Sequence, residues 1–282
     1  MQSGQPSRTA LGAAGHRAAH QVLEGGFIFT DPLAVRILGP HAEDAVRRAE
    51  SNPWRRRLRL FIAVRTRFAE DSLAAAVARG ARQLVVLGAG LDTYAYRATL
   101  AEGFRIFEVD HPATQAWKRQ RLAEAGIPEP RALTFAPVDF EREHLAGGLN
   151  AAGFDPTVQT FFTWLGVVPY LTEEAVFSTL GFIAGLPGGA QVVFDYANPM
   201  DLKAAPDENA DIAKRLAERV ALAGESFKSY FETDALHGKL KSLGFHEIKD
   251  LGPALIRERY FAKWGGSVPD RGGHIVSAAT IY

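Results

Sequence analysis

Two glycines and an acid twenty residues further on are the residues of this sequence best placed to do chemistry. Gly88 and Gly90, with Ala89 between them, come directly after the apolar run 83–87. Glycines adopt turns that side chains forbid, and they let a ligand approach backbone N–H groups closely. Asp110 follows the next apolar run, where a carboxylate can accept hydrogen bonds from ribose hydroxyls. The pattern predicts a nucleoside site, with a tight turn that binds no ligand as the alternative.

The position three residues beyond Gly90 indicates which nucleoside is bound. In dinucleotide-binding turns this position is glycine or alanine, which brings helix and strand together around a pyrophosphate. Here it is Thr93. The difference disfavours NAD and FAD. It suits a nucleoside without a pyrophosphate, such as S-adenosylmethionine.

Around this turn the chain resembles the leucine carboxyl methyltransferase superfamily, which includes bacterial small-molecule O-methyltransferases of the polyketide-tailoring kind. Five stretches match in order, at residues 65–67, 85–97, 107–112, 138–140 and 164–171. The resemblance covers roughly residues 9–282. It implies S-adenosylmethionine as methyl donor and a class I methyltransferase fold. That fold is a Rossmann-like α/β sheet of seven mostly parallel strands with an antiparallel last strand.

The same resemblance implies roles for single residues. The glycine turn lies under the methionine and ribose of the cofactor, and Asp110 binds the ribose. Asp139 and Phe140 hold the adenine, with a helix cap as the alternative for Asp139. Arg67 pairs with the cofactor carboxylate, with Arg65 as the other candidate, because a guanidinium can bind a carboxylate through two hydrogen bonds.

One position departs from the family pattern. Some members carry a glutamate where this chain has Leu165, so one cofactor contact is missing or supplied elsewhere. Tyr170 and Tyr196 are the candidate contacts to the methyl acceptor, with ordinary core packing as the alternative for Tyr170. No catalytic residue is assigned, because an acceptor that is already a carboxylate needs no general base.

Alternating short apolar runs and helical stretches must position these residues. Strands are expected at 83–87, 104–109, 132–138, 157–164, 191–195, 244–250 and 275–282. Helices between the first five runs predict a parallel sheet covered on both faces. Residues 1–80 are expected to form a helical lid. Residues 81–282 are expected to form the cofactor-binding domain, with a helical insertion at about 199–230.

Composition excludes several classes of protein. The 32 basic and 32 acidic residues balance, which argues against a nucleic-acid partner. The absence of cysteine excludes disulfides and thiolate metal sites. No metal site is expected, since only His16 and His20 have ligand-like spacing and a solvated face suits them better. No apolar stretch is long enough for a membrane span, and no secretory signal is visible, so a cytoplasmic protein is expected. Composition leaves the oligomeric state open.

The predicted function is therefore S-adenosylmethionine-dependent methylation of a hydroxyl or carboxyl group on a small molecule, in secondary metabolism. Three alternatives remain open. They are a methyltransferase acting on a protein C-terminal carboxylate, an NAD-dependent oxidoreductase, and a nucleoside-binding protein without catalysis.

Overall fold

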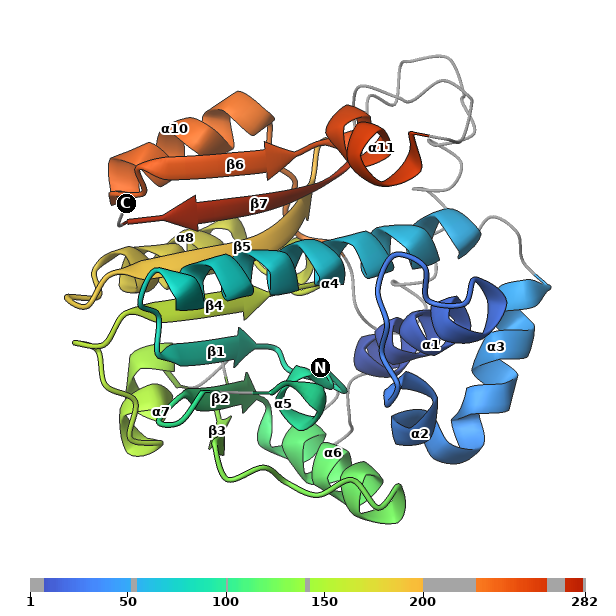
Figure 1. Ribbon diagram of the computed structural model, residues 1–282. Helices are drawn as coiled ribbons and strands as arrows, with labels where there is room; N and C mark the ends of the chain where they lie inside the picture. Colours follow the sequence, from blue (N-terminus) through green and yellow to red (C-terminus); the bar gives the residue numbers. More distant parts are fainter. Residues whose placement is uncertain are drawn as a thin grey trace.

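The computed structural model describes residues 8–51, 55–99, 101–139, 143–199, 227–262 and 272–280. Within these residues seven strands form one sheet in the order β3-β2-β1-β4-β5-β7-β6 (Figure 1). All neighbours are parallel except β7, which runs antiparallel to β5 and β6. The expected sheet with an antiparallel last strand is confirmed. The strands are β1 (Gln83–Leu87), β2 (Arg105–Asp110), β3 (Leu133–Pro137), β4 (Thr160–Trp164), β5 (Ala190–Ala197), β6 (Glu247–Leu251) and β7 (Gly273–Ala279).

Helices cover both faces of this sheet and one of its edges. The insertion expected at about 199–230 falls mostly on residues outside the described part of the chain. No described helix combines the length and apolarity needed to span a membrane. The helices are α1 (Arg8–Leu23), α2 (Ala34–Leu38), η1 (Gly39–His41), α3 (Ala42–Glu50), α4 (Arg55–Ala78), α5 (Tyr94–Arg97), α6 (Pro112–Glu124), α7 (Leu145–Ala151), η2 (Val168–Tyr170), α8 (Glu173–Ala184), α10 (Thr233–Leu243) and α11 (Pro253–Phe261).

Strand periodicity divides the core into two layers. Leu84 and Val86 pack with α4 and α11 on one face, whereas Val85 and Leu87 pack with α7, α8 and α10 on the other. Successive side chains of a strand point to opposite faces, so a strand buried on both sides must be apolar throughout. Figure 1 shows α4 lying across the near face of the sheet, with α8 behind it.

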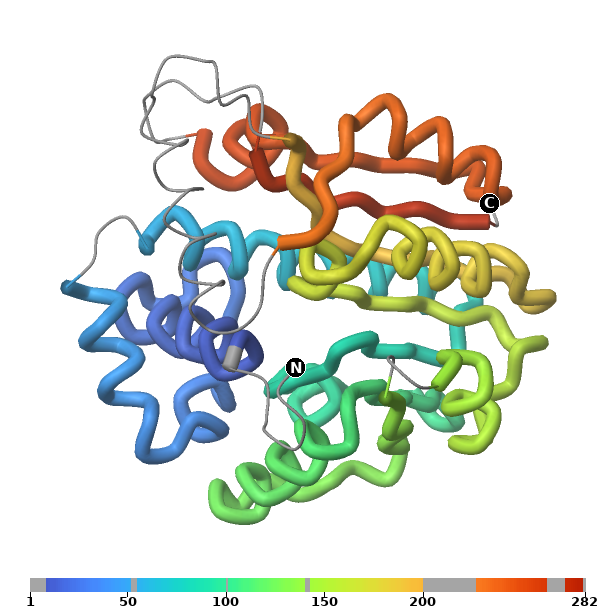
Figure 2. Tube along the Cα trace, turned by 180° about the vertical axis from the view of Figure 1, so that it is seen from behind, coloured from blue at the N-terminus to red at the C-terminus, as the bar shows by residue number. Residues whose placement is uncertain are grey.

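The N-terminal helices α1 to α3 form a third cluster beside the carboxyl ends of β1 and β2 (Figure 2). Leu33 and Leu38 pack there with Leu91 and with residues of α6. The solvated face expected for His20 is wrong: its side chain is fully buried, and Nδ1 lies 3.2 Å from Glu24. Glu24 is one helical turn further on and also accepts a hydrogen bond from Arg59, so the imidazole lies beside a buried ion pair.

Candidate active site

The turn after β1 has the geometry that the glycines were expected to provide. Gly88 and Gly90 have φ angles of 67° and 45°, a region that residues with side chains rarely adopt. A Cβ on Gly88 would lie 2.5 Å from Val167, in the loop 165–171 that follows β4. A Cβ on Gly90 would lie 2.9 Å from Ala10 of α1. The turn is therefore enclosed between the loop after β4 and the N-terminal helix.

Asp110 is bound directly to this turn. One carboxylate oxygen accepts a hydrogen bond from Gly90 N at 2.6 Å, and the other accepts from His111 N at 2.7 Å. Burial raises the pKa of Asp110, while these two donors and the nearby charge of Lys118 act against that rise. Each carboxylate oxygen accepts two hydrogen bonds, so both can also receive a hydroxyl. Glycine turn and acid are thus joined into one hydrogen-bonded unit.

Asp139 lies beside Asp110 because β2 and β3 end together. Val138 N donates to the Asp110 carbonyl at 2.9 Å, and the Asp139 carboxylate lies 4.0 Å from His111 Nε2. The Asp139 N–H donates to the Glu143 carboxylate, and the Asp139 carbonyl accepts from Glu143 N. Phe140 lies outside the described residues, so the adenine pair stays a prediction.

The two candidate arginines of α4 point to different places. Arg65 donates to Asp195 at 2.8 Å, and the second oxygen of Asp195 accepts from Gly166 N in the loop 165–171. Arg65 Nη2 lies 2.7 Å from where a Cβ on Gly166 would be, and its buried Nε has no hydrogen-bond partner among the described residues. Arg67 is half exposed and pairs with Asp71. The structure therefore brings Arg65 to the loop that encloses the glycine turn.

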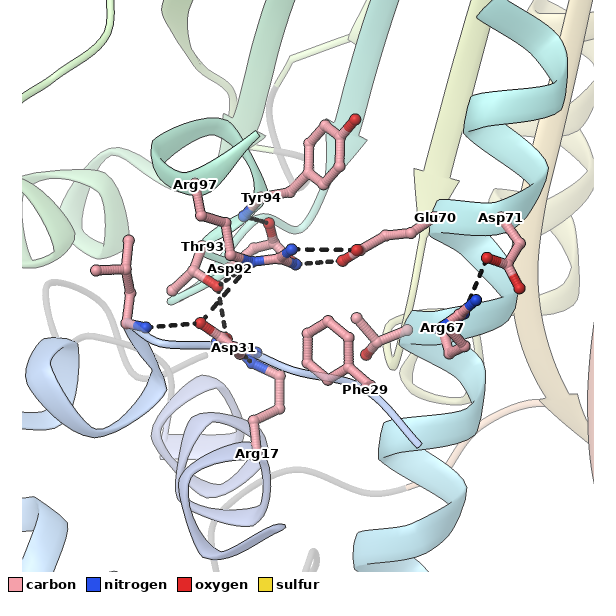
Figure 3. A network of polar contacts seen from close by, with 12 residues as sticks. Arg17, Phe29, Asp31, Arg67, Glu70, Asp71, Asp92, Thr93, Tyr94 and Arg97 are labelled. Atoms are coloured by element: carbon pink, nitrogen blue, oxygen red, sulfur yellow. Dashed lines mark hydrogen bonds and ion pairs between the residues drawn. The ribbon is translucent and has the colours of Figure 1, made fainter. Parts of the chain in front are cut away.

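A polar network joins the N-terminal helices to the segment after the glycine turn (Figure 3). Buried Asp31 accepts a hydrogen bond from the Thr93 hydroxyl at 2.7 Å, and Arg17 of α1 donates to the Leu91 carbonyl. Arg97 of α5 makes a two-bond ion pair with Glu70 of α4. Sequence reasoning missed this network. The one signal was the Asp-Pro pair at 31–32, which fits a helix start and gave no indication of a partner at Thr93.

An aromatic cluster adjoins the loop 165–171. The Tyr170 ring lies 5.3 Å from that of Phe227, which lies 6.2 Å from that of Tyr230. All three are partly exposed. Lys228 N donates to the Pro169 carbonyl at 2.7 Å, which fastens the segment 227–230 to this loop. The rings therefore lie next to the loop after β4.

Tyr196 and Leu165 lie in packed surroundings. The Tyr196 hydroxyl donates to Asp250 at 2.6 Å, and its ring stacks on His274. Burial and the adjacent carboxylate raise the pKa of Tyr196. Leu165 is partly buried against the core layer under α4. Acceptor binding by Tyr196 stays a prediction. Among the described residues no group of three or more histidine or acidic side chains could hold a metal ion.

The comparisons with known proteins agree with this geometry. The leucine carboxyl methyltransferase family model matches residues 10–184. A Bacillus subtilis protein named as an S-adenosyl-L-methionine-dependent methyltransferase, YktD, is 30% identical over 93% of each chain. A protein from Frankia alni named in the same way is 37% identical over 63% of this chain and 64% of its own.

The fold has a match among solved structures as well. A DUF574 family protein from Streptomyces avermitilis superposes with a TM-score of 0.54 at 14% identity, over 94% of this chain and 97% of its own. This similarity concerns the fold alone. The family match, the relative aligned over nearly the whole length and the strand order lead to one conclusion. The chain belongs to the leucine carboxyl methyltransferase family and is an S-adenosylmethionine-dependent methyltransferase.

Proposed function

We propose that this methyltransferase transfers the methyl group to an oxygen atom of a small molecule, and that it binds the cofactor between the glycine turn and the loop after β4. The observation that carries the proposed cofactor site is the 2.6 Å hydrogen bond from Gly90 N to Asp110. This bond fixes a partly buried carboxylate against the glycine turn. A ribose with two neighbouring hydroxyls is the group that such a carboxylate fits.

The remaining cofactor contacts follow from the surroundings of that turn. Asp139 is proposed to accept from the adenine amino group, because it closely follows β3, the strand that pairs with β2 beside Asp110. Arg65 is proposed to bind the cofactor carboxylate, since it lies against Gly166 and has an unused buried N–H. Arg67, which the family pattern favours, remains the rival candidate and pairs with Asp71 across an exposed surface.

The bound sulfonium supplies an activated methyl group, so the chain has mainly to orient the reactants and exclude water. The N-terminal helices suit the second task. Ala10 of α1 lies against Gly90, and Arg17 is hydrogen-bonded to Leu91, one residue further on. We propose that the part of residues 1–80 that precedes α4 forms a lid over the domain 81–282, whereas α4 itself packs on the face of the sheet. Opening the site for exchange would then require α1 to move away from the turn.

The acceptor is proposed to lie against the aromatic cluster of Tyr170, Phe227 and Tyr230. Partly exposed rings offer flat apolar surface, and stacked or edge-to-face contacts with a ligand ring add about 0.5–1.5 kcal/mol each. A general base is required only if the acceptor oxygen carries a proton at working pH. No described residue is assigned that role.

Labelled methyl transfer tests the acceptor class. The purified protein and S-adenosylmethionine carrying a labelled methyl group are added to a bacterial cell extract, which is then separated into small molecules and protein. We expect label in the small-molecule fraction. Label found only in protein, and released as methanol by mild base, would show a protein carboxyl methyltransferase instead.

The two arginines are separated by conservative substitution. Arg65→Lys and Arg67→Lys each keep a positive charge but lose two-bond recognition of a carboxylate. We expect Arg65→Lys to weaken S-adenosylhomocysteine binding about tenfold, the cost of one charge-assisted hydrogen bond. Arg67→Lys should stay within about twofold, because surface ion pairs contribute little. The reverse order would assign the carboxylate to Arg67.

A further inference from the structure

A buried ion pair lies behind the site, two residues before Asp110 on the same strand. The side chain of Glu108 has no exposed surface, and its Oε2 lies 2.6 Å from Nζ of Lys118, which is 1% exposed. The Tyr96 hydroxyl lies 3.4 Å from the same oxygen, and the Lys118 ammonium lies 5.2 Å from the centre of the Tyr96 ring. Oε1 of Glu108 has no hydrogen-bond partner among the described residues.

The ion pair between Glu108 and Lys118 contributes little to the stability of the fold, although both side chains are buried. Removing two charges from water costs several kcal/mol per ion, and mutual attraction repays this only when the remaining polar atoms are satisfied. Here they are not, because one carboxylate oxygen has no partner. Burial raises the pKa of Glu108 to about 7 despite the adjacent ammonium. A pair of well-packed apolar residues would serve stability at least as well, so the charges call for another explanation.

Strand geometry relates the pair to Asp110. β2 is regular from Arg105 to Asp110, so Glu108 and Asp110 project from the same face. Lys118 lies on α6, the helix that begins directly after His111, and Gln115 of that helix donates to the Glu108 carbonyl. Burial raises the pKa of Asp110, and the charge of Lys118 acts against that rise together with the N–H groups of Gly90 and His111. One ammonium thus acts on both acids of the strand.

We propose that Lys118 is a positioning residue for the ribose-binding acid: its ammonium, held in place by Glu108, supplies the positive charge that keeps the Asp110 carboxylate ionised against the glycine turn. This inference rests on the proposed ribose role of Asp110. Glu108 is the tether, because it fixes a long flexible side chain where the strand ends. Binding of the cofactor then depends on a charge that touches no part of it.

Other groups face Asp110 and Glu108 as well. His111 follows Asp110 and also lowers its pKa, and Asp139 pairs with His111. Asp92 and the Tyr96 hydroxyl act on Glu108 from the segment after β1. These groups are unchanged in every variant below, so a difference between variants reports on the Glu108–Lys118 pair.

The test is the pH profile of S-adenosylhomocysteine binding, measured by calorimetry from pH 5 to 9. In Lys118→Met we expect the midpoint at which binding is lost on acidification to rise by about one pH unit. Binding at pH 6 should weaken by up to about tenfold, the equivalent of one pKa unit, with little change at pH 9. Glu108→Gln keeps the ammonium and should not raise the midpoint.

A double variant keeps the test valid if Lys118→Met alone fails to fold. Glu108→Gln with Lys118→Met leaves no unpaired buried charge, and it should raise the midpoint as Lys118→Met does. A midpoint equal to that of the native protein in the double variant would overturn the inference, since packing alone would then explain the pair.

Asp110→Asn, measured in parallel, separates this inference from the function it rests on. If Asp110→Asn binds S-adenosylhomocysteine as the native protein does, the ribose assignment itself is wrong. If Asp110→Asn loses binding while the double variant keeps the native midpoint, only the role of Lys118 is wrong.

Discussion

Replacing Asp110 by asparagine removes the charge at the centre of the proposed cofactor site while keeping the side chain's shape. The carboxylate accepts hydrogen bonds from Gly90 N and His111 N, one on each oxygen. An asparagine has only one oxygen, so its NH₂ must face one of these two N–H groups. The variant loses one turn contact and both charge-assisted contacts to the ribose.

The size of the effect follows from these contacts. Hydrogen bonds to a charged group contribute about 1.5–3 kcal/mol each, so losing two ribose contacts costs about 3–6 kcal/mol of binding. That corresponds to a loss of affinity of at least about a hundredfold. One lost turn contact costs about 1 kcal/mol of folding stability, a shift of roughly 2–4 °C in Tm for a chain of this size.

Calorimetric titration with S-adenosylhomocysteine measures the loss directly. Asp155→Asn is the matched control, because Asp155 precedes β4, at the amino ends of the parallel strands, and accepts hydrogen bonds from Thr157. It should bind as the native protein does. The reasoning is refuted if Asp110→Asn keeps its affinity to within about threefold while remaining folded, since at least about 3 kcal/mol was assigned to the carboxylate.

Three further predictions concern stability and pH. Gly90→Ala and Gly126→Ala both place a side chain at positive φ, which costs about 1–2 kcal/mol of folding stability. Of these two variants, only Gly90→Ala brings the new Cβ against another residue, Ala10, at 2.9 Å. Thermal unfolding should therefore show a larger loss of stability for Gly90→Ala than for Gly126→Ala. Equal losses of stability would show that the contact between Gly90 and α1 has no effect. Thr93→Val leaves buried Asp31 without its hydroxyl donor and should cost about 1–3 kcal/mol of folding stability. Thr157→Val removes an exposed hydrogen bond and should cost under about 0.5 kcal/mol. Similar urea unfolding midpoints for the two variants would contradict a stabilising role for the network around Asp31. Burial raises the pKa of Glu108 to about 7, so the folded protein binds this proton more tightly than the unfolded chain does. The resulting contribution to folding stability is complete below the pKa of Glu108 in the unfolded chain and is lost as pH rises through 7. The Tm of the native protein minus the Tm of the double variant Glu108→Gln with Lys118→Met should decrease between pH 5 and pH 8. If this Tm difference stays constant, Glu108 does not titrate in this range.

The layout of the sheet could be predicted from short-range pattern. The run 83–87 is β1, with the same bounds. Apolar runs buried on both faces differ from helical stretches in period and length, so local sequence suffices. The helix α11 was missed. Its sequence has no strong one-sided apolar pattern, and only Ile256 among its residues is buried.

The candidate site likewise contains residues that the sequence could assign and residues that it could not. Gly90 and Asp110 could be paired because each belongs to a turn or strand end that the sequence marks. Arg65 could not be preferred to Arg67, because the choice depends on Asp195, which is 130 residues away. Two residues on one helix, one facing inward and one outward, look alike when the element they pack against is unknown.

The buried cluster around Asp250 was missed for a similar reason. Its partners Tyr196, His237 and His274 lie between 13 and 54 residues away along the chain. Only the pairing of β5, β6 and β7 brings them together. Long-range polar contacts of this kind leave no periodic signal in the sequence.

The most direct test of the central claim is a thermal-shift comparison of three ligands on the native protein. S-adenosylmethionine and S-adenosylhomocysteine, each at a hundred times its dissociation constant, should stabilise the fold by about 2.7 kcal/mol, a rise in Tm of roughly 5 °C or more. NAD at the same concentration should give no shift, because the turn has Thr93 where a dinucleotide site has its third glycine. Stabilisation by NAD, with no response to either methionine derivative, would contradict the account.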